Sequence, residues 1–158
     1  RSLEFKNNVI AQSSFNIFIK TLGFTYLNPH VYSDTVFFLG SVDKHHLRDL
    51  YSACKMLVFT SPYENYAHIL IEAMSCGAPI ICSNTTAMPE TCQSAAVYFH
   101  PSSTEQLTKI IMNLLNDNEL LNEYRDKSLL RSSEVDSHQD VNRKTNEIIN
   151  TVLSDNGA

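Results

Sequence analysis

Short apolar runs alternate with amphipathic segments along this chain from residue 35 onward. The apolar runs have the length and composition of strands in a buried parallel sheet, and they lie at residues 36–40, 56–61, 79–83 and 96–101. Apolar residues at helical spacing predict helices at residues 47–55, 67–75, 105–117, 119–132 and 138–153, with a short helical turn at Pro89 and Glu90. Strands and helices that alternate in this way predict an α/β fold with a doubly wound, Rossmann-like parallel sheet.

Polar residues and a glycine mark the ends of these predicted helices. Asp43 is a preferred N-cap for the helix that follows it. Residues 102–103, a serine pair, and Gln106 suggest a cap for the helix at 105–117. Gly77 follows the helix at 67–75 and predicts its C-terminal stop.

Length and charge narrow the range of functions. A chain of 158 residues suits one domain with a sizeable core, here residues 1–158 with a C-terminal helical extension from about 132 to 158. A formal charge of −5, without clustered Lys and Arg among aromatic residues, disfavours a nucleic acid partner. No apolar run approaches the ~20 residues that span a bilayer, and the chain shows no signal peptide, so we expect a cytoplasmic domain.

Cysteine and histidine show no metal-site spacing. Four cysteines fall within helix or strand patterns without a CxxC pair, and we expect reduced, mostly buried thiols at Cys54, Cys76, Cys82 and Cys92. The adjacent residues His45 and His46 point about 100° apart on a helix, without companion ligands. We interpret them as a solvated helix start and expect no metal site.

The chemistry of the chain is concentrated in residues 61–83. Glu64 falls in the loop after an apolar strand, and Glu72 lies about two turns into the next helix. Free backbone N–H groups at the start of a helix favour a diphosphate, and here they would belong to Tyr66, Ala67 and His68. Two carboxylates around such donors suit a sugar nucleotide, with Glu64 on the sugar and Glu72 on the ribose.

This run resembles the donor-binding signature of the retaining group 1 glycosyltransferases of the GT-B fold. The resemblance covers the two glutamates, which have seven residues between them, and the positions that follow, which are Ala73, Met74, Gly77 and Pro79. It implies the C-terminal half of such an enzyme, with an N-terminal acceptor-binding domain absent from this chain. It also implies retaining, metal-independent transfer from a nucleotide sugar as donor substrate, with no cofactor. We expect little activity from this half alone, and association with the cytosolic membrane face through the absent half.

The resemblance also implies roles for single residues. Glu64 would accept hydrogen bonds from sugar hydroxyls, and Glu72 would bind the ribose diol. The backbone of Val42 would contact the nucleobase. Arg1 and Lys6 would be the cations that neutralise the diphosphate. The sugar or phosphate would accept hydrogen bonds from the backbone amides of Asn65, Tyr66 and Ala67.

Three positions of this signature allow alternatives. Tyr66 is either a ligand contact or a core aromatic under the loop, and His68 lies beside the donor or packs into the core. Ala67 stands where the family more often has glycine, and its methyl group adds bulk near the ligand. This alanine and a shortened N-terminal segment make a noncatalytic or degenerate nucleotide-sugar-binding module an alternative function. A sugar-nucleotide epimerase, another relative with the GT-B fold, is a further alternative. We interpret residues 83–90 as a structural segment that lines the floor of the cleft.

The N-terminal segment has two interpretations. In one, residues 9–18 form the helix that follows the phosphate-binding lysine of the family, which would be Lys6. In the other, residues 15–23 form a strand, and Lys6 is not that lysine. We favour the helix.

Overall fold

The sheet of this domain has four parallel strands in sequential order. The computed structural model describes residues 17–20, 42–135 and 143–149. The strand order is β1-β2-β3-β4, and each strand pairs in parallel with the next. The strands are β1 (Ile17–Lys20), β2 (Met56–Phe59), β3 (Ile80–Ser83) and β4 (Ala96–Phe99). The predicted parallel sheet is therefore confirmed.

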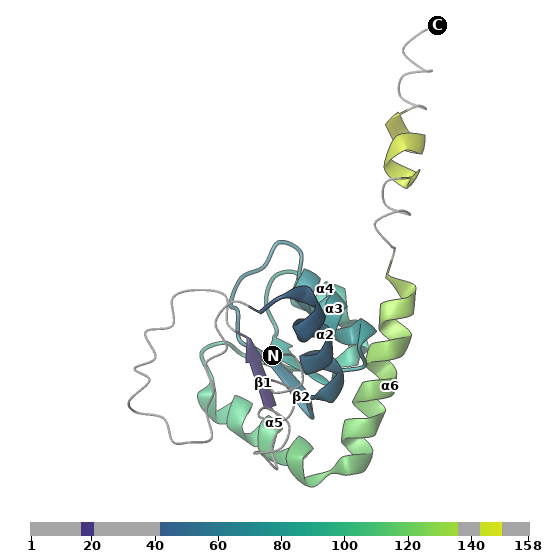
Figure 1. Cartoon of the computed structure of the whole chain (residues 1–158). Coiled ribbons are helices and arrows are strands. Elements are labelled where there is room, and N and C mark those ends of the chain that lie inside the picture. The colour runs from purple at the N-terminus through teal and green to yellow at the C-terminus, as the bar shows by residue number, and fades with distance from the viewer. Residues whose placement is uncertain (1–16, 21–41, 136–142, 150–158) are drawn as a thin grey trace, which may run out of the picture.

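Helices pack on both faces of this sheet (Figure 1). One face carries α2 (Lys44–Ala53), α3 (His68–Ser75), α4 (Met88–Cys92) and the short 3₁₀ turn η2 (Gln93–Ala95). The other face is covered by α5 (Thr104–Asn116) and the first part of α6 (Asn118–Glu134). The later part of α6 packs against α3 and η2, so this helix joins the two layers at the side of the sheet.

Side chains of the central strands alternate between the two layers. Met56 and Val58 of β2 belong to the buried cluster under α5 and α6, whereas Leu57 and Phe59 belong to the cluster under α2, α3 and α4. All four side chains are fully buried. A strand covered on both faces has no polar side, which explains the continuous apolar run seen in the sequence.

The predicted N-caps are confirmed. Asp43 Oδ1 accepts hydrogen bonds from the N–H groups of His45 and His46, both at 3.0 Å. Ser103 Oγ accepts from the N–H of Gln106 at 3.2 Å. The Gln106 side chain does not complete a reciprocal box, because its Oε1 accepts from the backbone N–H of His100 at 2.8 Å. This contact ties the start of α5 to the end of β4.

Gly77 ends α3 as predicted. It has a φ of 70°, and its N–H donates to the carbonyl oxygen of Met74 at 2.9 Å. The N–H of Ala78 donates to the carbonyl oxygen of Ala73 at 3.0 Å. These two bonds form a Schellman motif, which glycine favours because it adopts positive φ without a Cβ clash.

The preference for an N-terminal helix is wrong where the structure describes it. Ile17 and Phe18 lie in β1, paired with Met56 and Leu57 of β2. Apolar residues in IFIK fit a helical pattern and a buried strand alike, and pairing with a strand almost 40 residues later favours the strand. Lys6 lies outside the described residues, as does the strand predicted at 36–40. Of the C-terminal helix predicted at 138–153, residues 143–149 are helical.

The cysteines agree with the prediction of reduced and mostly buried thiols. Cys54, Cys82 and Cys92 are buried, Cys76 is half-buried, and none forms a disulfide. Burial raises the pKa of Cys54 to about 12, so this thiol is not nucleophilic at neutral pH. Within the described ranges, no helix combines the length and the apolar character that crossing a bilayer requires.

Candidate functional site

Glu64 lies where the loops after β2 and β3 meet. Its backbone N–H donates to Thr86 Oγ1 at 3.0 Å, and its carbonyl oxygen accepts from the N–H of Ala87 at 3.4 Å. The loop after β3 therefore holds both sides of the Glu64 peptide backbone. Both loops leave the carboxyl ends of parallel strands, which is the edge where sheets of this type bind ligands.

Side-chain hydroxyls join the same two loops at further points. Ser83 Oγ donates to the carbonyl oxygen of Ser61 at 2.6 Å, and Thr85 Oγ1 donates to that of Pro62 at 2.8 Å. Ser61 and Ser83 are buried, so the bond between them satisfies polar groups that water does not reach, whereas the bond from Thr85 is exposed. We call Ser83, Thr85 and Thr86 the hydroxyl clasp, because each bonds the backbone of the Glu64 loop across more than 20 residues of sequence.

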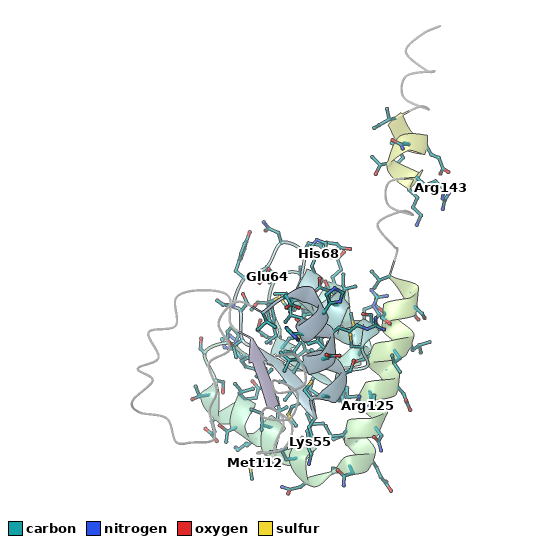
Figure 2. The ribbon with its side chains drawn as sticks, viewed as in Figure 1. Lys55, Glu64, His68, Met112, Arg125 and Arg143 are labelled. Carbon is teal, nitrogen blue, oxygen red and sulfur yellow. The ribbon has the colours of Figure 1, made fainter. Side chains whose placement is uncertain are left out.

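The carboxylate of Glu64 is incompletely satisfied. Its Oε1 atom is buried and accepts no hydrogen bond from the residues that the structure describes. A buried carboxylate oxygen without a donor is unfavourable, and such a group is uncommon in folded proteins unless it serves a function. Figure 2 places Glu64 and His68 at the same end of the domain. A ligand hydroxyl at this end would supply the hydrogen bond that Oε1 lacks.

The start of α3 differs in one respect from the prediction. Ala67 has φ −79° and ψ 62°, and the N–H of His68 donates to the carbonyl oxygen of Tyr66 at 2.8 Å. This is an inverse γ-turn. The amide of His68 is thus used within the loop in this conformation, whereas we predicted that it would point outward as a free donor.

The structure excludes core packing for two of the three residues that allowed alternatives. Tyr66 is 51% exposed and His68 is also exposed, so neither packs in the core. Their ring centroids lie 4.4 Å apart with the planes tilted by 57°. Ala67 is only 1% exposed and belongs to the buried cluster with Leu70 and Met88. Its methyl group therefore packs inward, and its negative φ is open to any residue, which removes the steric objection to alanine at this position.

Glu72 lies on the second turn of α3 and is exposed. Burial raises the pKa of Tyr51 in α2, and the negative charge of Glu72 raises it further. This coupling places the Glu72 carboxylate on the side of α3 that faces α2. Val42, the predicted nucleobase contact, is half-buried and directly precedes the N-cap of α2.

The remaining predicted site residues do not add to this geometry. Arg1 and Lys6 lie outside the described residues, so their roles stay predictions. Asn65 is exposed in the loop between Glu64 and Tyr66. Among the described residues, no group of three His, Cys, Asp or Glu side chains is arranged to hold a metal ion.

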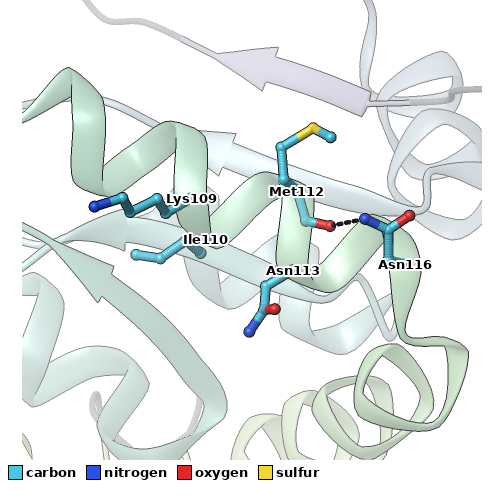
Figure 3. Close-up of a pocket in the computed structure, with 5 residues that line it drawn as sticks. All are labelled: Lys109, Ile110, Met112, Asn113 and Asn116. Carbon is cyan, nitrogen blue, oxygen red and sulfur yellow. Dashed lines mark hydrogen bonds between the residues drawn. The ribbon is translucent and has the colours of Figure 1, made fainter.

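A hollow of about 450 Å³ lies elsewhere, on the outer side of α5 (Figure 3). Met112, one of its lining residues, lies at the end of the domain opposite to Glu64 in Figure 2. None of the predicted site residues that the structure describes lines it, and the described residues that do are Lys109, Ile110, Met112, Asn113 and Asn116. We therefore place the candidate site at the Glu64 loop, where buried polar chemistry is present.

Comparison with known proteins decides the family. Residues 30–130, more than half of the chain, match the family described as glycosyl transferases group 1. The chain belongs to this family. Among relatives of this group 1 glycosyltransferase domain, the O-antigen chain mannosyltransferase B of Escherichia coli is 36% identical over 80 residues, which cover 51% of this chain and 21% of that protein.

Two further relatives are mannosyltransferases by name. The serotype-specific mannosyltransferase WbdA of Escherichia coli is 30% identical over 96 residues, 61% of this chain and 12% of that protein. The MMP alpha-(1->4)-mannosyltransferase of Mycolicibacterium hassiacum is 28% identical over 116 residues, 72% of this chain and 28% of that protein. The group 1 glycosyltransferase domain thus spans less than a third of each of these relatives.

A solved structure shares the fold. Sucrose-phosphate synthase from Thermosynechococcus elongatus superimposes with a TM-score of 0.70 and 24% identity, over 77% of this chain and 31% of that chain. This likeness concerns the fold alone. Together with the parallel sheet, it confirms the predicted α/β, Rossmann-like architecture of a GT-B glycosyltransferase.

The sequence did not single out the hydroxyl clasp. Residues 83–90 were expected to have a structural role, and the bonds to the Glu64 loop add a direct connection to the candidate site. A weak signal was present, since Ser83, Thr85 and Thr86 follow a strand at the same sheet edge as Glu64. That edge is where polar side chains are most often functional in such folds.

Proposed function

We propose that this group 1 glycosyltransferase domain binds a nucleotide diphosphate sugar for retaining, metal-independent transfer of the sugar to an acceptor hydroxyl. The observation that carries the proposal is the buried Oε1 atom of Glu64 at the carboxyl edge of the sheet, which has no hydrogen-bond partner among the described residues. A carboxylate oxygen accepts hydrogen bonds and donates none, so the hydroxyls of a sugar are matched partners. A second anion at this position would be repelled.

The two glutamates divide the donor between them in this proposal. Glu64 accepts hydrogen bonds from hydroxyls of the transferred sugar. Glu72, on the side of α3 that faces α2, accepts from the ribose diol, and Val42 before α2 contacts the base through its backbone. The diphosphate then lies between the two acids, near the start of α3.

The start of α3 assists the departing diphosphate. The helix directs its positive dipole end toward this position, and the amides of Asn65, Tyr66 and Ala67 donate to no acceptor among the described residues. Preorganised donors of this kind stabilise charge that develops on a leaving group. Arg1 and Lys6 would add positive charge, and the exposed ring of His68 lies beside the same turn.

The transferred sugar is a mannosyl group in this proposal. Three relatives with substantial similarity to the chain carry the name mannosyltransferase, including one that matches 72% of the chain. Each is several times longer than the matched segment. We propose that an N-terminal domain of the full-length protein recognises the acceptor. The acceptor would then approach the anomeric carbon from the side of that domain.

Isothermal titration calorimetry tests donor binding. The panel contains UDP, GDP and ADP, each compared with a sugar-bearing form such as UDP-glucose, GDP-mannose and ADP-glucose. We expect one nucleotide to bind, and its sugar form to bind more tightly. Glu72→Ala should weaken both forms, because both contain the ribose. Glu64→Gln should weaken only the sugar form, by about tenfold to a hundredfold, the usual worth of a hydrogen bond to a charged group.

Glu105→Gln is the matched control for these variants. Glu105 is exposed in the first turn of α5, pairs with Lys109 at 2.7 Å and takes part in none of the hydrogen bonds between the two loops of the candidate site. Its substitution should leave all affinities unchanged. A folded protein that binds no member of the panel, or Glu64→Gln that binds the sugar form as tightly as wild type, would contradict the proposal. Activity with EDTA present tests metal independence in the full-length protein.

A further inference from the structure

Thr86 adopts a backbone conformation that its residue type disfavours. Its φ is 50°, in the left-handed region that glycine enters freely and that β-branched residues rarely adopt. The side chain is exposed, so hydrophobic burial does not compensate for this strain. Strained residues of this kind gather at functional sites, where surrounding contacts hold them in place.

The hydroxyl of Thr86 supplies what glycine would lack. Its Oγ1 accepts the backbone N–H of Glu64 at 3.0 Å, and its own hydrogen is directed at Met88 Sδ, 3.8 Å away. Met88 is fully buried, so it gives the hydroxyl a fixed neighbour. The following residue, Ala87, donates its N–H to the carbonyl oxygen of Glu64 at 3.4 Å. The left-handed turn at Thr86 thus presents two successive groups to one residue of the opposite loop.

We propose that Thr86 is a positioning residue, whose strained conformation and hydroxyl set the place of the Glu64 carboxylate for the donor sugar. This inference rests on the proposed function, in which Glu64 contacts that sugar. The carboxylate lies at the far end of the Glu64 side chain, so a small rotation of the peptide displaces Oε1 from its buried position by a larger distance. The backbone contacts from Thr86 and Ala87 restrict that shift.

Three substitutions separate the hydroxyl from the backbone strain. Thr86→Ser keeps the hydroxyl, Thr86→Val keeps the shape without it, and Thr86→Gly removes both the hydroxyl and the strain. The measured quantity is the ratio of the dissociation constants of the nucleoside diphosphate and its sugar form. We measure it by calorimetry on the full-length protein, with the UDP, GDP or ADP pair that binds in the panel above. A partial loss of folded protein affects both ligands equally and leaves this ratio unchanged.

We expect Thr86→Val and Thr86→Gly to lower the ratio by about fivefold. This is the usual effect of losing one hydrogen bond between neutral groups, here the bond that holds the Glu64 backbone in place. Thr86→Ser should keep at least half of the wild-type ratio. Affinity for the nucleoside diphosphate alone should stay unchanged in all three, because Glu64 does not contact it. Thr108→Val is the matched control, since Thr108 is exposed and its Oγ1 donates to the carbonyl oxygen of Thr104, one turn earlier in α5, at 2.8 Å.

The outcomes distinguish this inference from the proposed function. If Glu64→Gln lowers the ratio while Thr86→Val and Thr86→Gly do not, the positioning role is wrong and donor binding stands. If Thr86→Ser behaves like Thr86→Gly, the hydroxyl is not the cause and the inference also fails. If the wild-type protein does not prefer the sugar form, the proposed function fails, and the positioning role fails with it.

Discussion

Gly77→Ala tests whether backbone conformation alone requires a glycine at the end of α3. A Cβ at this position would lie 3.4 Å from both Cγ and Cδ2 of Leu129 and 3.5 Å from Cγ of Arg125. These atoms belong to flexible side chains of α6, and small rotations relieve such contacts. The main cost therefore comes from the φ of 70°, which alanine adopts at a penalty of about 1–2 kcal/mol.

Alanine also changes the unfolded chain. It has fewer backbone conformations than glycine there, which by itself favours the folded state by about 0.4–1 kcal/mol. The two effects oppose each other, and we expect a net loss of about 1 kcal/mol in the free energy of unfolding. Asparagine enters the left-handed region more readily than alanine. Gly77→Asn should therefore destabilise the protein less than Gly77→Ala, although its side chain is larger.

Urea unfolding at constant temperature measures these differences. The midpoint should fall in the order wild type, Gly77→Asn, Gly77→Ala, with the same dependence of free energy on urea in all three proteins. A Gly77→Ala protein as stable as wild type would refute the backbone argument. A Gly77→Asn protein less stable than Gly77→Ala would show instead that contact with Leu129 and Arg125 decides the effect.

Two other predictions concern stability. Ser128 is fully buried, and its Oγ donates to the carbonyl oxygen of Ala78 at 2.8 Å; Ser128→Ala should cost about 1–3 kcal/mol in urea unfolding, and an unchanged midpoint would contradict this. The hydrogen bond from the His46 N–H is the main cause that lowers the pKa of Asp43 below 3.8. The stability that the ionised Asp43 carboxylate contributes is therefore present above pH 3.8, and it is lost as pH falls through the folded-state pKa of this group. The stability advantage of wild type over Asp43→Asn should shrink in that range, and an advantage constant from neutral pH to pH 3 would refute the linkage.

Much of the fold could be predicted because its signals are local. The strands at 56–59 and 80–83 are short apolar runs, and the caps at Asp43 and Gly77 bond residues within one turn of the chain. The first strand could not be predicted in this way. Residues 17–20 match a helical and a strand pattern equally, and pairing with β2 is a long-range interaction that no local window contains.

The residues of the candidate site remain predictions from the sequence, and the structure corrects one part of their expected geometry. Glu64 and Glu72 follow from their spacing and from the ends of the elements around them. The amide of His68 is engaged by Tyr66 instead of free, because the loop closes on itself in a γ-turn before the helix begins. The sequence carries no sign of that turn, since Ala67 is compatible with many backbone conformations.

The sequence by itself determined the α/β architecture and the helix ends, because hydrophobic periodicity and capping act within a few residues. It also proposed the two acids of the candidate site from their spacing. Only the tertiary structure decided how Glu64 is held. Its backbone bonds Thr86 and Ala87 across more than 20 residues of chain, and its Oε1 is buried and unpaired among the described residues. Contacts of this kind exist only when two loops are brought to one sheet edge, since burial and partner distance are properties of the packed molecule.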